Sequence, residues 1–405
     1  MATPKLRFKE FDGDWNKSTI GNFVLNYKGG ASLTPADFVE YSDCEVIPKK
    51  AISSGGLLQL DKVVPTFCTL EFFNSNQNYI VDSEYLITTL RDLVPSGPSI
   101  GYIVKYESNK KYILAQGVYG FRIKNDLNRD FLIQFSNTSK FRLHMQSIMV
   151  GSTQVHIRNQ DYFSTKLYTP SLIEQTKIAS FLSAVDEKIS QLTRKHELLR
   201  QYKQGMMQKL FSQQIRFKAD DGSEFGEWEE VALSEIAVIT MGSSPKSENY
   251  NEILNGLPLL QGNADIKNRK SLPRLYTSEI TRKCNVGDIL LSVRAPVGFV
   301  AISEHYACIG RGLCSIKANP NYLQGFIYQW LLSKENSWGS LSQGSTFESV
   351  NSDQIKNLSI QIPCLEEQTK IANFLSAIDQ KIEVVAQQIE QAKTWKKGLL
   401  QQMFV

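Results

Sequence analysis

The chain has 405 residues, 42% hydrophobic and 21% charged, a composition that excludes a disordered protein and leaves room for two or more domains. No apolar run approaches the roughly 18 residues that cross a bilayer, the first residues lack the apolar core of a signal peptide, and the six cysteines are scattered without the spacing of zinc ligands. The net charge of +4 is compatible with nucleic-acid binding but does not indicate it.

Residues 1–170 are predicted to form a first globular domain. Short β-branched and aromatic runs broken by Gly, Pro and Asn, such as Tyr112-Ile113-Leu114, favour a mostly-β domain of the α+β class. Arg, Lys, Asn and Gln are the side chains that contact bases and phosphates in DNA complexes. The candidates for DNA contacts in this domain are Lys28, Arg91, Lys105 and Arg122. For these residues, and for the candidates of the second domain given below, a solvated surface is an equally good explanation of each single residue.

Residues 171–212 are predicted to form one long helix. Its apolar residues are spaced by three and four, which is the seam of a coiled coil. Ser171 and Glu174, directly after Pro170, fit a capping box at the helix start. The seam residues are Leu182, Val185, Ile189, Leu192, Leu199 and Met206, and Lys203 interrupts them.

Residues 213–362 are predicted to form a second mostly-β domain, with a helix around residues 323–334. Gly242 to Lys246 lacks the Gly-Lys-Ser/Thr ending of a nucleotide-binding loop, so ATP binding is not expected. Arg294 has a counterpart in Arg91, and for this repeated arginine a scaffold ion pair is favoured over a phosphate contact. The candidates for DNA contacts are Ser243, Ser244, Lys246, Gln261, Asn263, Lys267, Arg269, Lys270, Arg274, Arg294 and Arg311.

Residues 363–405 repeat the first helix. Glu174 to Ile189 recurs almost residue for residue as Glu367 to Ile382, and Lys396 interrupts the second seam as Lys203 interrupts the first. The seam residues are Leu375, Ile378, Ile382, Val385, Ile389 and Leu399. The domain starts match too, since Arg7-Phe8-Lys9 recurs as Arg216-Phe217-Lys218 and Trp15 as Trp228. The chain is therefore a duplicated pair of domain and helix, an internal pseudo-twofold repeat.

Two matched seams in one chain favour pairing with each other as an antiparallel coiled coil. About 40 residues of helix span about 60 Å, so the pair would separate the two globular domains by a stiff spacer. The alternative is that each helix packs only on the surface of its own domain.

No arrangement of residues in the sequence indicates catalysis. The HExxH, GxSxG and Walker motifs are missing, and the four histidines are scattered. Asn319-Pro320-Asn321-Tyr322 approaches an amino-methyltransferase motif, but its third position differs and no glycine-rich cofactor loop accompanies it. We predict a chain without a catalytic centre, a metal site or a cofactor of its own.

In this layout the sequence resembles, over essentially its whole length, the specificity subunit of type I restriction–modification systems. The residues that carry the resemblance are the repeated Glu-Gln-x-x-Ile-Ala-x-x-Leu-Ser-x-x-Asp-x-x-Ile, the Gly287–Gly298 segment, Gln343–Thr346, and the Trp15 and Trp228 segments. The resemblance implies two target-recognition domains, each binding one half of a split DNA site, with the coiled coil fixing the gap between the halves.

The same resemblance implies partners and a location. Expected partners are double-stranded DNA, two methyltransferase subunits docked on the helices, and a restriction subunit with translocase activity. S-adenosylmethionine, ATP and Mg²⁺ would be bound by those partner subunits, and no membrane is involved. The complex would be cytoplasmic in a bacterium.

Two other functions stay open at this point. The chain would be a methyltransferase with a degenerate cofactor site if it bound cofactor and methylated DNA alone. It would be a scaffold for protein partners if its assembled complex lacked salt-dependent DNA binding, because phosphate contacts impose a steep salt dependence.

Overall fold

The computed structural model describes residues 3–338 and 349–405. It divides into two compact units: unit 1 comprises Met1–Thr193 and Gln387–Val405, and unit 2 comprises Arg194–Ala386. The Gln343–Thr346 segment named above lies outside the described residues.

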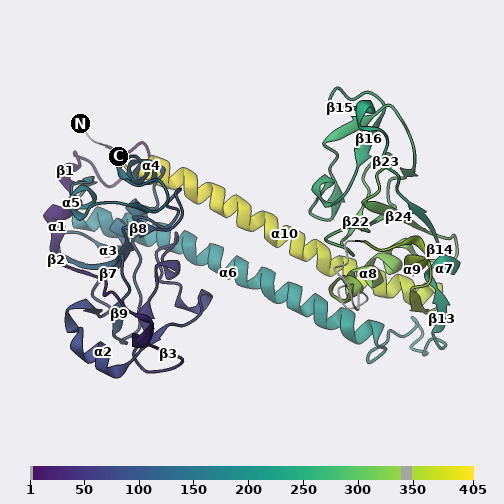
Figure 1. The fold of residues 1–405 in the computed structure, drawn as a ribbon, viewed down its shortest axis with the longest axis horizontal. Coiled ribbons are helices and arrows are strands. Elements are labelled where there is room, and N and C mark those ends of the chain that lie inside the picture. Colours follow the sequence, from purple (N-terminus) through teal and green to yellow (C-terminus); the bar gives the residue numbers. More distant parts are fainter. Residues whose placement is uncertain (1–2, 339–348) are drawn as a thin grey trace. The chain divides into compact units, whose positions relative to one another are not determined.

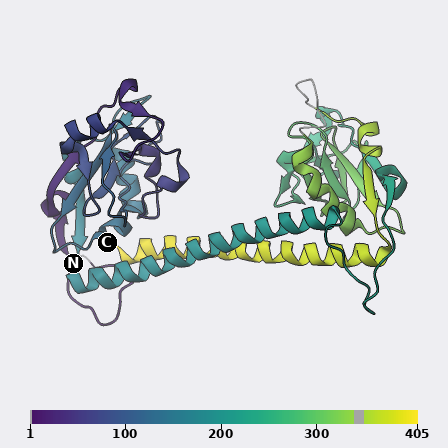
Figure 2. The ribbon, with the colours of Figure 1, turned by 90° about the horizontal axis from the view of Figure 1, so that it is seen from below.

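Two long helices each contribute to both units. Helix α6 spans Leu172–Phe211 and helix α10 spans Leu365–Met403 (Figure 1). Unit 1 contains the start of α6 and the end of α10, whereas unit 2 contains the end of α6 and the start of α10. The two helix segments of each unit therefore run antiparallel, beside one face of that unit's β domain (Figure 2).

Unit 1 is built from short strands and helices. Its strands are β1 (Asn16–Thr19), β2 (Val24–Gly29), β3 (Phe38–Val39), β4 (Val46–Ile47), β5 (Phe67–Cys68), β6 (Ile80–Val81), β7 (Leu86–Thr89), β8 (Arg91–Asp92), β9 (Tyr112–Leu114), β10 (Val118–Ile123), β11 (Val155–His156) and β12 (Lys166–Thr169). Besides its segments of α6 and α10, its α-helices are α1 (Ile20–Phe23), α2 (Leu70–Ser75), α3 (Arg129–Ser136), α4 (Ser139–Ile148) and α5 (Asn159–Phe163).

Unit 2 has longer sheets. Its strands are β13 (Glu229–Ala232), β14 (Ala237–Met241), β15 (Tyr250–Asn251), β16 (Leu257–Leu260), β17 (Ile266–Lys267), β18 (Lys270–Ser271), β19 (Leu275–Thr277), β20 (Lys283–Cys284), β21 (Ile289–Ser292), β22 (Val300–Ile302), β23 (Ala307–Ile309), β24 (Leu313–Ala318) and β25 (Ser359–Ile362). Besides the long helices, it has α7 (Leu233–Ile236), α8 (Gln324–Lys334) and α9 (Ser352–Lys356).

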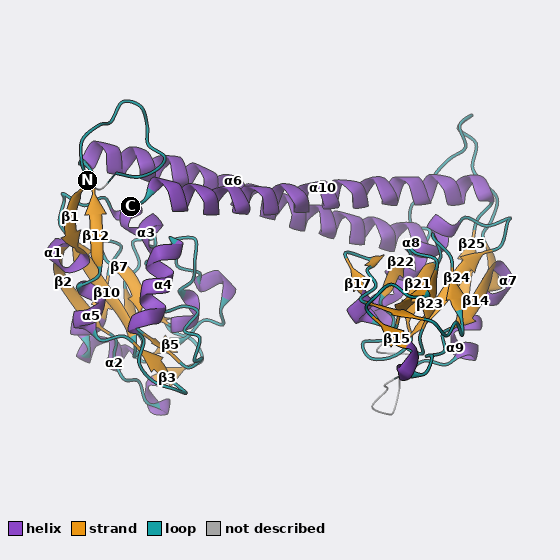
Figure 3. Ribbon diagram, turned by 90° about the horizontal axis from the view of Figure 1, so that it is seen from above, coloured by secondary structure: helices purple, strands orange, loops and turns teal. Residues whose placement is uncertain are grey.

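The two units repeat one arrangement of strands (Figure 3). The sheet β2-β10-β7 of unit 1 matches the β14-β24-β21 part of a larger sheet in unit 2, and β1-β12 matches β13-β25. In β4-β9-β6 and in β16-β23-β20 alike, the central strand pairs parallel on one side and antiparallel on the other. The predicted internal repeat of mostly-β domains is therefore confirmed, and unit 2 differs by extra strands at the sheet edges.

The repeated Arg and Glu residues join each domain start to its own long helix. In unit 1 the guanidinium of Arg7 donates to both carboxylate oxygens of Glu174 at 2.8 and 2.7 Å. In unit 2 Arg216 donates to Glu367 in the same way at 3.2 and 2.8 Å. Both carboxylates are buried, with at most 1% of the residue exposed. The bidentate geometry explains why this pair of residues recurs in the sequence.

The predicted capping box is made only in part. The Glu174 backbone N–H donates to Ser171 Oγ at 3.4 Å, but its carboxylate accepts from Arg7 instead. An ion pair is stronger than a hydrogen bond to a neutral backbone amide, so Arg7 takes the carboxylate. The neighbouring glutamine completes the helix start, since the amides of Gln175 and Gln368 each donate to the carbonyl of the preceding proline.

The lysines that interrupt the seams pair with aspartates across the helices. In unit 1 Lys396 of α10 donates to Asp186 of α6 at 2.5 Å, and in unit 2 Lys203 of α6 donates to Asp379 of α10 at 2.6 Å. Each aspartate also accepts from a glutamine of its own β domain, Gln134 or Gln329, at 2.8 Å. A repeated Gln–Asp–Lys bridge thus ties both helix segments to each domain.

The predicted seam residues are buried or half-buried. In unit 1 the buried ones are Leu182, Val185, Leu192, Ile389 and Leu399, and Ile189 is half-buried. In unit 2 the buried ones are Leu375, Ile378 and Val385, and Leu199, Met206 and Ile382 are half-buried.

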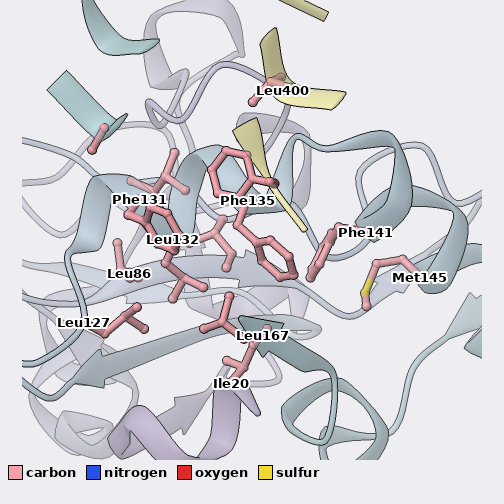
Figure 4. Packing of buried hydrophobic residues seen from close by; sticks show 14 of the residues in the cluster. Ile20, Leu86, Leu127, Phe131, Leu132, Phe135, Phe141, Met145, Leu167 and Leu400 are labelled. Carbon is pink, nitrogen blue, oxygen red and sulfur yellow. The ribbon is translucent and has the colours of Figure 1, made fainter. Parts of the chain in front are cut away.

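The C-terminal end of each long helix packs into a domain core: the end of α10 in unit 1 and the end of α6 in unit 2. In unit 1 Leu400 and Phe404 join a buried cluster with Phe131 and Phe135 of α3 (Figure 4). In unit 2 the matching residues are Met207, which joins that unit's buried cluster, and Phe211, which packs on Phe326.

One backbone hydrogen bond recurs at these helix ends. The Leu6 N–H donates to the Gln402 carbonyl at 2.9 Å, and the Ile215 N–H donates to the Lys209 carbonyl at 3.3 Å. No helix among the described residues is long and apolar enough to span a membrane, and these residues contain no cluster of His, Cys, Asp and Glu able to hold a metal.

Candidate nucleic-acid interface

A tight turn joins the two main sheets of unit 1, at the link from β9 to β10. The Val118 N–H donates to the Ala115 carbonyl at 2.9 Å. Gly117 has a φ of +86°, a left-handed conformation that favours glycine at the third position of such a turn. Gln116 stands at the second position and is exposed.

A corresponding turn joins β23 to β24 in unit 2, although Gly312 at its third position lacks the positive φ of Gly117. The Leu313 N–H donates to the Gly310 carbonyl at 3.1 Å, and Arg311 is the exposed residue at the second position. Strand register makes the two turns equivalent, because Leu114 pairs with β4 as Ile309 pairs with β16.

In each unit a glycine passes very close to the turn: Gly30 directly after β2 in unit 1, and Gly242 directly after β14 in unit 2. A Cβ at Gly30 would lie 1.8 Å from the Ala115 carbonyl oxygen, and a Cβ at Gly242 would lie 2.1 Å from that of Gly310. Only glycine fits at these two positions. The turn is held in the same way in both units.

The repeated arginines lie beside these turns. The Leu90 N–H donates to Gly117 and the Val293 N–H donates to Gly312, at 3.1 and 2.9 Å, so the following residues, Arg91 and Arg294, are brought next to the turns. Both are exposed. Across residues 3–338 and 349–405, neither arginine forms a salt bridge, so the favoured scaffold ion pair is not found there.

In unit 2, predicted residues from separate loops meet at the turn. Ser244 Oγ accepts from the Arg311 backbone N–H at 3.1 Å, and the Ser243 N–H donates to the Ile309 carbonyl at 2.9 Å. The Gln261 carbonyl lies 2.2 Å from where a Cβ of Gly312 would be. The structure thus brings together Ser243, Ser244, Gln261 and Arg311.

Asn263 and Arg274 belong to the edge of this cluster. Asn263 Nδ2 donates at 3.3 Å to the carbonyl of Pro296, in the loop that follows Arg294. Arg274 donates to Asp265 at 2.9 Å, and the other oxygen of Asp265 accepts from the Gln261 N–H at 2.8 Å. Arg274 therefore supports the loop of Gln261, and its own side chain is 62% exposed.

The remaining unit 2 candidates lie elsewhere. Arg269 donates to both oxygens of Glu335 at 2.6 and 2.8 Å. Burial lowers its pKa and hydrogen bonding to Glu335 raises it, with a net rise. Lys270 pairs with Glu304 at 2.8 Å. Arg269 and Lys270 are accounted for by internal ion pairs.

Lys246 and Lys267 are both exposed. The Lys246 ammonium approaches Glu248 only to 3.9 Å, and within the described parts of the chain Lys267 forms no salt bridge. These two lysines stay available for phosphate contacts.

Three candidates of unit 1 are held by contacts within the domain. Lys28 donates to the Ile80 carbonyl at 2.7 Å, and burial lowers its pKa. Lys105 pairs with Asp130, and Arg122 with Asp82, each at 2.8 Å. These charges already have partners, so internal packing explains their presence.

The sequence patterns missed the residues that surround the unit 1 turn. They are Gln116 at its second position and Lys49 and Lys50 in the loop after β4. The Lys49 Cε lies 3.4 Å from where a Cβ of Gly117 would be, and Lys50 is exposed. The short match of Ala115-Gln116-Gly117 to Gly310-Arg311-Gly312 is the signal that could have found them.

Each unit is thus a β domain clamped to a long helix, with an exposed polar turn flanked by an arginine that forms no salt bridge with any described residue. The family model of the type I restriction modification DNA specificity domain matches the chain twice, over residues 12–200 and 226–394. The chain belongs to this family. It is a DNA-recognition subunit of a type I restriction–modification complex and works with other subunits, not as an enzyme itself.

Two relatives and one solved structure align with most of this chain. The putative type I restriction enzyme MjaX specificity subunit of Methanocaldococcus jannaschii is 33% identical over 76% of this chain and 75% of its own length. The type I restriction enzyme MjaVIII specificity subunit of the same organism is 26% identical over 97% and 94%. The type I restriction-modification S subunit from M. genitalium has the same fold, with a TM-score of 0.64 at 17% identity over 100% and 99% of the two chains.

Proposed function

We propose that each β domain binds one half of a split DNA sequence through the surface around its turn. The observation that supports this most directly is the pair of equivalent turns, each exposed and each beside an arginine without an ion-pair partner among the described residues. Arginine gives both phosphate and base contacts. In this proposal the target-recognition domains are residues 1–170 and 213–362.

The helical repeats, residues 171–212 and 363–405, set the gap between the half-sites. A spacer that connects two weakly binding domains gives one specific device through the high effective concentration of the second domain. The Gln–Asp–Lys bridges fix each helix pair in register with its own domain, which makes the length of the paired helices the quantity that sets the gap.

Methyltransferase subunits dock on the helices in this proposal. Each unit exposes a leucine at a helix start and an aromatic residue on the facing helix: Leu172 and Trp395 in unit 1, Leu365 and Tyr202 in unit 2, each between 45% and 54% exposed. Equivalent surfaces fit two copies of one partner. S-adenosylmethionine, ATP and Mg²⁺ then belong to the methyltransferase and restriction subunits, and the complex acts in the cytoplasm.

The test is the methylation pattern in cells. The chain and its methyltransferase partner are expressed in a host without adenine methylation, and methylated adenines are mapped by single-molecule sequencing. A two-part motif that disappears when the chain is left out is expected. Methylation without the chain, or none with it, contradicts the proposal.

A matched deletion tests the spacer. Residues 190–196 and 386–392 are removed together, which shortens both helices between the two Lys–Asp pairs. Seven helical residues span about 10 Å, close to three base-pair steps of about 3.4 Å, so the gap should shorten by about three base pairs. An unchanged gap contradicts the spacer role, and salt-independent binding of the complex to DNA favours the scaffold alternative.

A further inference from the structure

The two turns differ in one exposed side chain. Unit 1 has Gln116 at the second turn position, where unit 2 has Arg311. The two turns occupy corresponding places between strands, but their backbones differ at the third position, where Gly117 has a φ of +86° and Gly312 has no positive φ. The two surfaces therefore differ in turn conformation as well as in the side chain that is presented.

Each turn is held rigidly from several sides. In unit 1 the Ala115 N–H donates to Ile47 at 3.2 Å and the Gly117 carbonyl accepts from Leu90. In unit 2 the Gly310 N–H donates to Leu260 at 2.8 Å and the Gly312 carbonyl accepts from Val293. A side chain on such a support is pre-organised for whatever approaches the surface.

The polar ends of Gln116 and Arg311 are not used inside the fold. Neither side chain forms a hydrogen bond or ion pair with another residue in the ranges that the structure describes, in contrast to Arg122 and Arg269. Arg91 and Arg294 flank the two turns and supply a positive charge that is the same in both units. The turn residue is therefore one exposed polar group that distinguishes one surface from the other, beside the replacement of Pro48 by Gln261 in the neighbouring loop.

We propose that the residue at the second turn position selects a base in each half-site: Arg311 a guanine and Gln116 an adenine. In the major groove an arginine donates twice to guanine O6 and N7, whereas a glutamine amide both donates to and accepts from adenine N6 and N7. The flanking Arg91 and Arg294 contact phosphate. This assignment rests on the proposed function, since it presumes that the turn surfaces face DNA.

Exchanging the two residues tests the assignment in the full complex with its methyltransferase partner. Arg311→Gln should change one guanine position in one half of the methylated motif to adenine, with the other half and the gap unchanged. Gln116→Arg should change one adenine to guanine in the opposite half. Good bidentate contacts give discrimination of about 10- to 100-fold. Lys317→Gln changes an exposed lysine on β24, the strand that follows the turn; it is the matched control and should leave the motif unaltered.

The outcomes separate the inference from the proposed function. If the wild-type complex methylates a two-part motif and both variants methylate the same motif, the inference is wrong and the proposed function stands. If the wild type shows no two-part motif, the proposed function fails first.

If a variant methylates nothing, its binding to duplexes that differ only at single positions decides the matter, with Arg311→Lys measured alongside. A loss of about 10-fold or more, confined to one guanine position, supports the inference. An equal loss on all duplexes, including unrelated DNA, overturns it, because a phosphate contact behaves in that way.

Discussion

Units 1 and 2 attach a long helix to a β domain with the same contacts, but they present different side chains at corresponding turns. The Arg–Glu clamp and the Gln–Asp–Lys bridge recur with nearly the same distances, whereas Gln116 corresponds to Arg311 and Pro48 to Gln261 around the turns. This contrast separates the repeated residues that maintain the fold from those that do not. In this chain, residues kept in both copies of the repeat are mostly paired inside the fold, and the surfaces proposed to bind DNA are where the copies diverge.

The largest expected difference concerns the helix ends. Phe404 is 5% exposed, and its ring centroid lies 5.0 Å from that of Phe131 and 6.4 Å from that of Trp15. Phe211 is only half-buried, with its ring centroid 5.6 Å from that of Phe326. Phe404→Ala should cost about 4 kcal/mol of unfolding free energy in unit 1, and Phe211→Ala roughly half of that in unit 2. Hydrogen exchange measured by mass spectrometry assigns the loss to each unit. Equal losses would contradict the deeper insertion of the α10 end.

The Arg–Glu clamps should differ less. Arg7→Ala leaves Glu174 buried without its cation, and breaking such a pair costs about 3 kcal/mol. Arg216→Ala should cost less, because Trp228 Nε1 also donates to Glu367, at 3.1 Å. Urea denaturation of both variants measures the difference. Arg200→Ala, an exposed arginine on α6, is the control and should stay within about 0.5 kcal/mol of wild type; a greater loss for Arg216→Ala than for Arg7→Ala would refute this account.

The two glycines against the turns should behave alike in stability and differently in specificity. Gly30→Ala and Gly242→Ala force a Cβ into a backbone carbonyl, with an expected cost of about 2 kcal/mol. Gly30→Ala should impair recognition of one half-site and Gly242→Ala that of the other, as seen in methylation maps. The control is Gly205→Ala on α6, where a Cβ meets nothing within 4 Å. That change should stabilise the helix by up to about 1 kcal/mol.

The smallest effect is a pH dependence in unit 2. Burial lowers the pKa of Lys203 below its ordinary 10.5, despite the neighbouring Asp379. Between the lowered pKa and 10.5 the unfolded chain keeps a proton on Lys203 that the folded chain has released. The free energy of unfolding therefore rises with pH across this window, and the gain is lost as the pH falls through the pKa of the folded state. Lys203→Met should abolish that rise in thermal unfolding, with Lys209→Met as the control for loss of a charge. A rise that persists in Lys203→Met would exclude Lys203 as its source.

The long helices and the duplication could be predicted from the sequence because the seam and the Glu-Gln repeat are local patterns. The partners of charged residues could not. Arg269 is held by Glu335, 66 positions away, and Arg122 by Asp82, 40 positions away. Such pairs depend on how strands and loops are placed together, which composition does not reveal.

The turn surface of unit 1, unlike that of unit 2, escaped prediction for a related reason. Insertions change the offset between the two copies along the chain, so Gln116 and Arg311 are matched only once strand pairing gives the register. Arg91 and Arg294 were found as a repeated pair, but only the fold shows that neither forms a salt bridge with any residue in the described ranges. The repetition of Arg91 and Arg294 therefore predicted their shared position, whereas their contacts could be read only from the structure.

The hydrogen bonds at the two helix ends have a topological consequence. In unit 2 a covalent link, Ser212 to Gln214, connects the end of α6 to the next domain, and the Ile215–Lys209 contact lies beside it. In unit 1 the Leu6–Gln402 contact holds the corresponding ends without a covalent bond. Joining residues 1 and 405 with a short linker and opening the chain near residue 213 should therefore yield a circular permutant with the same interior contacts. The two repeats therefore follow one another as in a ring, with a covalent junction in unit 2 and a backbone hydrogen bond at the equivalent junction in unit 1.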